Sequence, residues 1–190
     1  MDVGMMMVFA SYGWDDCPDD RVWEEEIRLA RLAADSGFDV LWSAEHHFND
    51  YSFVPDNLHL MSYLAGVCPG MSLGTAAVIL PWHDPLRVAE NAAVLDMLCG
   101  GKLRLGMGRG LARREFAAFR LSMDESRERF DEAAPLMVRL ETMAQGLMER
   151  VSGLSLEALL CQAEGVDSQD RTAEPGPIDS TPPTATRSAH

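Results

Sequence analysis

Residues 71–107 read MSLGTAAVILPWHDPLRVAENAAVLDMLCGGKLRLGM. Residues 71–80 are an apolar run that ends at a proline, which predicts a buried strand. The Asp84-Pro85 pair predicts a helix start, because aspartate caps helices and proline fits the first helical position. The helical pattern runs to Leu98 and stops at two glycines, and residues 103–107 predict the next strand. The stretch therefore predicts a strand–helix–strand unit with parallel strands.

The same unit repeats along the first 150 residues. Apolar runs at 3–9 and 38–42 predict two earlier strands, and helical patterns follow them at 19–36 and 56–65. After the fourth strand, helical pattern resumes from residue 111 to about residue 150. Apolar, non-alternating strands predict an α/β fold with a parallel sheet covered by helices. Two architectures fit this pattern: an open doubly wound sheet and a segment of a (β/α)8 barrel.

The composition describes an acidic chain with enough apolar material for a core. Of the 190 residues 47% are hydrophobic, and the net charge is −14. Such a surface disfavours binding to nucleic acid or to a membrane surface. No apolar run reaches the roughly 20 residues of a membrane span. The first ten residues lack the positive charge of a signal peptide, so we expect a cytoplasmic chain. The four cysteines are scattered without a C-x-x-C pair, which predicts free thiols and no zinc site.

The end of the sequence differs from the rest. Residues 151–164 predict one weak amphipathic helix. Residues 165–190 contain no Leu, Met, Phe, Trp or Tyr but four of the ten prolines, so we expect a polar, disordered tail. No strand pattern follows residue 107, whereas a complete (β/α)8 barrel takes about 250 residues. A barrel would therefore be truncated to about its first four βα units.

The second predicted strand is followed by Glu45-His46-His47-Phe48. Adjacent histidines in extended chain point to opposite sides, so the two are poorly placed to bind one metal ion together. A histidine that faces a pocket with Glu45 nearby would form a proton-handling or hydrogen-bonding site. The structural alternative is a neutral histidine that the backbone satisfies at a strand end.

Small residues mark the ends of the third and fourth strands. Those within 73–78 would let a flat ring approach the backbone, or would simply fit a crowded contact between sheet and helix. Residues 106–110, GMGRG, match neither the dinucleotide fingerprint nor the P-loop. Arg109 offers a planar donor fork for a phosphate, or lies in a solvated turn. We expect His83 to be solvated beside Asp84, and Glu115 either to be solvated on a helix or to reach a pocket.

Several short motifs follow one another along residues 1 to 140: SGFD (36–39), EHHF (45–48), LGTAAVILP (73–81), HDPLRVAE (83–90), LDMLCGGKL (95–103), GMGRG (106–110), EF (115–116) and DESR (124–127). In this order and spacing they resemble the luciferase-like, flavin-dependent monooxygenases. The resemblance implies a TIM barrel, with residues 1–150 as its N-terminal half. Beyond about residue 140 no motif resembles the family, and we expect unrelated sequence there.

The resemblance also implies roles for single residues. His46 would be the catalytic histidine near the flavin. Ala76-Ala77 would form a non-proline cis peptide against the isoalloxazine ring. Gly108 stands where the family's luciferases carry a reactive cysteine, at the flavin site. Arg109 would bind the phosphate, and Glu115 would lie close to the flavin.

The activity that the resemblance implies is that of an oxidoreductase. Reduced FMN from a separate flavin reductase would react with O2 to give a C4a-peroxyflavin, which oxygenates a small organic substrate. His46 would manage the proton. One alternative is a deazaflavin-dependent oxidoreductase of the same superfamily. Another is a truncated, non-catalytic flavin-binding or interaction fragment.

Half a barrel would leave two sheet edges unpaired and an apolar interior exposed, so we expect self-association. A hydrolase with a metal ion bound by histidines is a distant alternative; its ligands would be His46, His47, His59 and His83.

Overall fold

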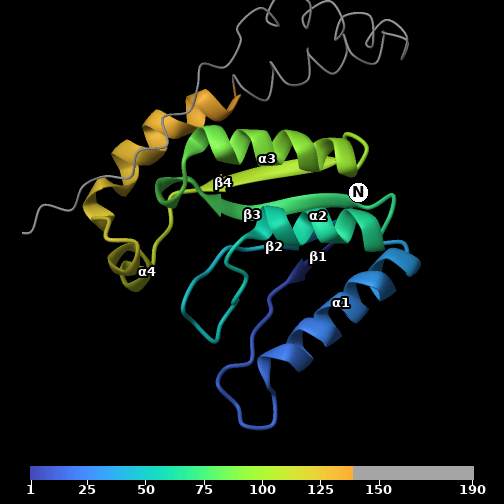
Figure 1. Cartoon of the computed structure of the whole chain (residues 1–190). Coiled ribbons are helices and arrows are strands. Elements are labelled where there is room, and N and C mark those ends of the chain that lie inside the picture. The colour runs from blue at the N-terminus through green and yellow to red at the C-terminus, as the bar shows by residue number, and fades with distance from the viewer. Residues whose placement is uncertain (139–190) are drawn as a thin grey trace, which may run out of the picture. The chain divides into compact units, whose positions relative to one another are not determined.

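The computed structural model describes residues 1–138, and the helix and tail expected within 151–190 lie outside that part. Its sheet has four parallel strands in the order β1-β2-β3-β4 (Figure 1). The four predicted strands are confirmed, as β1 (Gly4–Met7), β2 (Val40–Ser43), β3 (Ser72–Ile79) and β4 (Leu103–Gly108). A doubly wound sheet reverses its strand order at a switch point, whereas these strands advance in one direction. The described sheet therefore has the strand order of a barrel wall.

Three helices connect consecutive strands: α1 (Asp19–Asp35), α2 (Asn57–Val67) and α3 (Pro85–Leu98). Asp56 caps α2, since its Oδ1 accepts a hydrogen bond from the His59 backbone N–H at 2.9 Å. Asp84 caps α3 in the same way, as predicted, with its Oδ1 2.8 Å from the Leu86 nitrogen. Right-handed crossovers between strands that advance one way place these helices on one face of the sheet.

The helical pattern expected after β4 is confirmed in part within residues 111–138, where the chain is interrupted near residue 120. Arg120 has a φ of 58°, in the left-handed region that helical residues do not adopt. Ser122 Oγ then accepts a hydrogen bond from the Asp124 nitrogen at 3.2 Å and starts a new turn. The segments are α4 (Arg113–Ala118), the 3₁₀ turn η2 (Met123–Glu125) and a helix over 126–138.

The two faces of the sheet differ. Leu41 and Leu73 occupy neighbouring positions in the register and are fully buried in the core beneath the helices. The next register position brings Met6, Trp42 and Gly74 to the opposite face, where Met6 is 45% exposed. A Cβ on Gly74 would lie 2.3 Å from the Trp42 ring, so glycine is required for the indole to lie across β3.

Cys17, Cys68 and Cys99 are free, as expected, and Cys161 lies outside the described residues. Within residues 1–138, none of the helices combines the length and the apolar character that a membrane crossing requires.

Candidate active site

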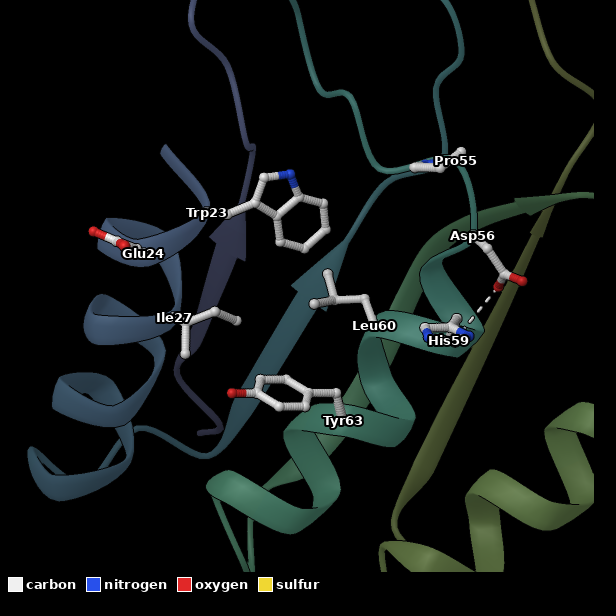
Figure 2. Close-up of a pocket in the computed structure, with 8 residues that line it drawn as sticks. All are labelled: Trp23, Glu24, Ile27, Pro55, Asp56, His59, Leu60 and Tyr63. Atoms are coloured by element: carbon white, nitrogen blue, oxygen red, sulfur yellow. Dashed lines mark hydrogen bonds between the residues drawn. The ribbon is translucent and has the colours of Figure 1, made fainter. Parts of the chain in front are cut away.

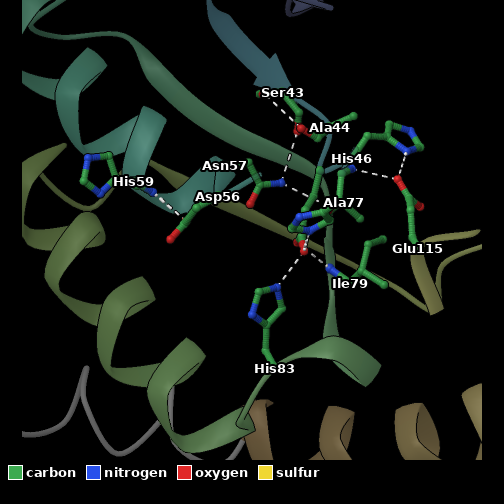
Figure 3. A network of polar contacts seen from close by, with 12 residues as sticks. Ser43, Ala44, His46, Asp56, Asn57, His59, Ala77, Ile79, His83 and Glu115 are labelled. Atoms are coloured by element: carbon green, nitrogen blue, oxygen red, sulfur yellow. Dashed lines mark hydrogen bonds and ion pairs between the residues drawn. The ribbon is translucent and has the colours of Figure 1, made fainter. Parts of the chain in front are cut away.

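Polar side chains gather where β2, β3 and β4 end. Figure 3 shows His46 facing Glu115 on one side, and His83, Ile79 and Ala77 grouped on the other. These residues come from four segments: the chain after β2, the end of β3, the 3₁₀ turn η1 (Leu80–Trp82) with its following residue, and α4. Parallel strands bring their carboxyl ends to one edge, which is where ligands bind in such folds.

His46 and Glu115 form a histidine–carboxylate pair. Glu115 Oε1 lies 3.1 Å from His46 Nδ1 and accepts the His47 backbone N–H at 2.8 Å. An ionised carboxylate can only accept, so the contact selects the tautomer with hydrogen on Nδ1 and leaves His46 Nε2 available. Glu115 is 1% exposed, and its Oε2 has no hydrogen-bond partner among the described residues. Glu115 is therefore buried, and its predicted alternative as a solvated residue on a helix is wrong.

Glu45 is a second buried carboxylate, and the described structure satisfies both of its oxygens. Its Oε1 lies 3.1 Å from His47 Nε2 and 2.6 Å from His83 Nε2, while Oε2 accepts the Ile79 backbone N–H at 2.9 Å. Burial raises the pKa of Glu45, but the hydrogen bonds from both histidines, the charge of His83 and the Ile79 N–H outweigh it. The pKa of Glu45 therefore lies below its ordinary value.

The expectation that His83 is solvated is wrong. Its side chain is 31% exposed and its Nε2 contacts Glu45. Burial lowers the pKa of His83, but the hydrogen bond and charge of Glu45, helped by Asp56, raise it above 6.5 overall. The two adjacent histidines do point to different partners, His46 to Glu115 and His47 to Glu45, as extended chain predicts.

The peptide bond between Ala76 and Ala77 is cis, as the resemblance implies. Asn57, which is 1% exposed at the start of α2, donates through Nδ2 to the Ala77 oxygen at 3.1 Å and to the Ser43 oxygen at 3.4 Å. Asn57 thus ties the ends of β2 and β3 together. Sequence reasoning missed it, since an asparagine after a helix cap carries no signal of a distant carbonyl partner.

Opposite the cis bond, β3 has one residue more than β4. The register passes from Thr75 opposite Leu105 directly to Val78 opposite Met107, so only Gly106 faces the two alanines. Thr75 Oγ1 donates to the Gly106 oxygen at 2.9 Å and accepts the Gly106 N–H at 3.0 Å. A Cβ on Gly106 would lie 2.2 Å from the Thr75 oxygen. Glycine is therefore required where the two strands close around the bulge.

Of the residues predicted to hold a cofactor, Ala76 and Ala77 form this bulge and Gly108 lies against it. Ala76 is exposed, and a Cβ on Gly108 would lie 3.2 Å from the Ala77 Cβ, so a side chain there would crowd the same surface. Arg109 is exposed and has no ion pair or side-chain hydrogen bond among the described residues. An open backbone surface beside an unpaired cation fits a flat ring that carries a phosphate.

Aromatic rings enclose His47, a feature that the sequence did not reveal. Its ring lies 5.2 Å from Trp82 and 4.7 Å from Phe119, both edge-on, and the Trp82 and Phe119 rings stack at 5.5 Å. His47 is 8% exposed. These contacts separate His47 from the more accessible His46, whose side chain is 25% exposed.

Of the remaining histidines, His190 lies outside the described residues, and His59 belongs to a different feature. A groove of about 680 Å³ lies between α1 and α2, where Trp23 and Ile27 face Leu60 and Tyr63 (Figure 2). His59 lines that groove. In the part of the chain that the structure describes, no three His, Cys, Asp or Glu side chains are grouped to hold a metal ion.

Comparison with known proteins identifies the family to which the chain belongs. The sequence pattern of the luciferase-like monooxygenases matches residues 1–181, so the similarity extends beyond residue 140, contrary to the expectation of unrelated sequence there. The alkanal monooxygenase alpha chain of Photorhabdus laumondii is 34% identical over 106 residues, which are 56% of this chain and 30% of that protein. The chain spans about a third of the length of the curated relatives it matches.

Two solved structures share the fold. Monooxygenase RslO1 from Streptomyces bottropensis is 36% identical with a TM-score of 0.69, over 73% of this chain and 42% of that one. The oxygenating constituent of 3,6-diketocamphane monooxygenase from a Pseudomonas putida plasmid, solved with FMN, is 18% identical with a TM-score of 0.65. That match covers 72% of this chain and 38% of the Pseudomonas protein and supports the fold alone.

Proposed function

The chain belongs to the luciferase-like monooxygenases, and from that premise we propose that it binds reduced FMN at the carboxyl ends of β2, β3 and β4. The proposed reaction is flavin-dependent oxygenation of a small organic substrate by O2. Reduced flavin supplies the oxygen-activating chemistry when it is bound. The residues of this chain bind the flavin, limit the access of water and move a proton.

The His46–Glu115 pair is the observation that carries this proposal. A buried carboxylate 3.1 Å from Nδ1 fixes the ring and its tautomer, so that Nε2 is free to take or give a proton. The side chain of His46 keeps 25% of its surface exposed, so a ligand can reach it. A histidine held in this way is suited to general acid–base chemistry rather than to structural support.

The proposed flavin contacts involve the cis Ala76-Ala77 segment, Gly108, Arg109 and Glu115. The exposed Ala76 surface, kept open by Gly108, accommodates the ring system, and Arg109 pairs with the phosphate. Glu115 Oε2, unpaired within residues 1–138, is an acceptor for a flavin N–H or for a water at the site. Supply of reduced flavin by a separate reductase is part of the proposal.

A flavin-binding module without turnover is the second candidate. In residues 1–138, β1 and β4 each pair with only one neighbour, and the sheet face that carries Trp42 and Met6 is open. Such edges favour pairing with further strands or with a second copy of the chain. This candidate and the enzyme share the flavin site, so the two differ only in turnover.

Titration of the 190-residue chain with FMN tests the flavin site. We expect FMN to raise the melting temperature, because a ligand of the native state stabilises it. Arg109→Ala weakens FMN binding by roughly tenfold or more, since a hydrogen-bonded charge is lost. Arg21→Ala, which removes one positive charge from the exposed start of α1, is the matched control. An unchanged melt with FMN contradicts the proposal, and preferential binding of a deazaflavin mononucleotide would reassign the cofactor.

Turnover distinguishes the enzyme from the module. With a flavin reductase and a panel of aldehydes, we expect product formation that His46→Ala lowers by about 10²–10⁴-fold, the range of general acid–base catalysis. FMN affinity should change little in this variant. FMN binding without product from the wild-type chain would support the non-catalytic module instead.

A further inference from the structure

A row of four rings lies beside the proposed flavin site, in the loops that follow β1 and β2. Centroids are 5.6 Å apart for Trp14 and Tyr12, 6.2 Å for Tyr12 and Tyr51, and 5.8 Å for Tyr51 and His46. We call Trp14, Tyr12 and Tyr51 the aromatic row, which leads to His46. Its members are 63%, 56% and 47% exposed, respectively. Single exposed apolar side chains are common on protein surfaces, whereas a contiguous exposed group of them marks an interaction site.

The backbone holds these rings in place. The Ser11 and Tyr12 nitrogens both donate to the Asp50 oxygen, at 3.0 and 3.2 Å, which joins the two loops. Tyr12 has a φ of 54° and Ser52 a φ of 55°, a region that residues with a side chain rarely adopt. Strained conformations that the surrounding contacts maintain are concentrated at functional sites.

The charges around the row select among aromatic ligands. Residues 8–20 and 43–56, which carry the row and His46, contain no Lys or Arg. They do contain exposed acidic residues, among them Asp15 and Asp16 next to Trp14, and Asp50 beside Gly13. Arg21 lines a pocket with Trp14, but Asp16, Glu25 and Glu26 line it too. The acidic groups outnumber this arginine, so an anionic ligand is disfavoured there. The phosphate of a flavin therefore belongs near Arg109 after β4, and the row is left for a different molecule.

We propose that the aromatic row binds the substrate, and that the substrate is a planar, uncharged molecule with fused aromatic rings. It stacks on Tyr51, the ring next to His46, with its reacting edge toward that histidine. Tyr12 and Trp14 contact it at an angle, because the Tyr12 ring is tilted by 46° from Tyr51 and by 39° from Trp14. Ring faces favour offset stacking with other rings over contact with a flexible alkyl chain. The assignment of the bound molecule as substrate rests on the proposed function, whereas binding to the row does not.

Calorimetric titration of the 190-residue chain with matched probes tests the binding. 2-Naphthol and 1-decanol have the same number of carbons and one hydroxyl group, but only the first is flat. We expect 2-naphthol to bind at least about tenfold more tightly, a difference of about 1.4 kcal/mol. 2-Naphthoate, which adds a negative charge to the same rings, should bind more weakly than 2-naphthol. Equal affinity for the flat and the linear alcohol would overturn the proposal.

Variants locate the binding site. Tyr51→Leu should weaken 2-naphthol binding by about tenfold, and Tyr51→Phe should restore it, because the ring is kept. Tyr63→Leu is the matched control: Tyr63 is 51% exposed but lines the groove between α1 and α2. Loss of binding in Tyr63→Leu and not in Tyr51→Leu would place the ligand in that groove and overturn the proposal. Circular dichroism of each variant checks that it folds.

FMN titrations separate this inference from the proposed function. Tyr51→Leu should leave FMN affinity unchanged, and FMN should not displace 2-naphthol from the wild-type chain. Displacement would mean that the row holds the flavin ring, which overturns the substrate assignment. If FMN does not bind at all while 2-naphthol binds at the row, the proposed function fails and the aromatic site stands.

Discussion

Two buried carboxylates at the same edge of the sheet have opposite surroundings. Glu45 accepts hydrogen bonds from three groups on three segments, namely His47, His83 and the Ile79 nitrogen. Glu115 accepts two, from His46 and from the His47 nitrogen, and its Oε2 has no partner within residues 1–138. Both glutamates are almost completely buried. The comparison separates a carboxylate that holds the strand ends together from one that leaves bonding capacity for a ligand.

The difference follows from what each glutamate connects. Glu45 joins the chain after β2 to the end of β3 and to the residue after η1, so its loss would release three segments. Glu115 comes from α4, a helix of six residues, and its main partner is the ring proposed to handle the proton. A fully satisfied buried network adds rigidity, whereas a partly satisfied one marks a place where something else binds.

Truncation of Glu45 should have the largest effect on stability. Glu45→Ala leaves the buried His47 side chain and the Ile79 N–H without partners and removes the counter-charge of His83. Breaking a buried pair by removing one partner costs about 3–5 kcal/mol. Urea unfolding followed by circular dichroism measures this loss as a lower midpoint at an unchanged slope. A loss under about 1 kcal/mol would mean that Glu45 does not organise the strand ends.

Gly106→Ala should have the second largest effect on stability. It tests the close approach of β4 to β3 at the bulge. The added Cβ would lie 2.2 Å from the Thr75 oxygen, and the strands must separate at the bulge. We expect a cost of about 2–3 kcal/mol, in the range of overpacking. Gly66→Ala is the control, since a Cβ in that helical position meets no atom within 4 Å. It should stabilise the chain by roughly 0.5–1 kcal/mol through helix propensity, and equal effects of the two changes would contradict the close approach.

The Glu45–His83 pair should also give a pH dependence. The pKa of His83 is raised above 6.5, so its contribution to stability is complete below pH 6.5 and is lost as the pH rises through the higher folded value. The pKa of Glu45 is lowered below 4.5, so its contribution is complete above pH 4.5 and is lost as the pH falls through the lower folded value. The pair is therefore strongest between these limits.

Unfolding free energies measured from pH 5 to pH 9 test this dependence. We expect the wild-type chain to lose at most about 1 kcal/mol above pH 6.5, the size of a partly exposed pair. His83→Gln should remove this slope while Asp56 and Glu45 are kept. A slope that persists in His83→Gln would assign the titration to another group.

The sequence predicts the strands and helices of this region but not the different hydrogen-bond partners of the two glutamates. Apolar runs predict the strands and Asp84 predicts the start of α3, and both predictions succeed because these signals are local in the chain. Glu45 and His83 are 38 positions apart, and His46 and Glu115 are 69 apart. Their pairing depends on which strand ends become neighbours, which periodicity does not encode. The roles of His46 and Glu115 came from the family resemblance, and the contact of Asn57 with Ala77 has no signal at all.

Glu115→Gln should have the smallest effect on stability, and that makes it the sharpest test. The carbonyl oxygen of glutamine can still accept from His46 Nδ1 and from the His47 nitrogen. Its amide group then occupies the position of Oε2, where no protein donor from residues 1–138 stands. Loss of the charge weakens the accepted bonds, so we expect a change of about 1 kcal/mol or less. Urea unfolding measures it.

The same substitution at Glu45 should behave differently. Glu45→Gln places an amide donor against the nitrogens of His47 and His83 or against the Ile79 N–H, and at least one of these buried groups loses its acceptor. For turnover we expect the opposite order, with the larger effect at Glu115. Glu115→Gln removes the charge that orients His46, so product formation should fall by at least about tenfold in a chain that remains folded. If Glu115→Gln were instead as destabilising as Glu45→Gln and left turnover unchanged, both glutamates would be structural, and the unpaired oxygen of Glu115 would carry no functional meaning.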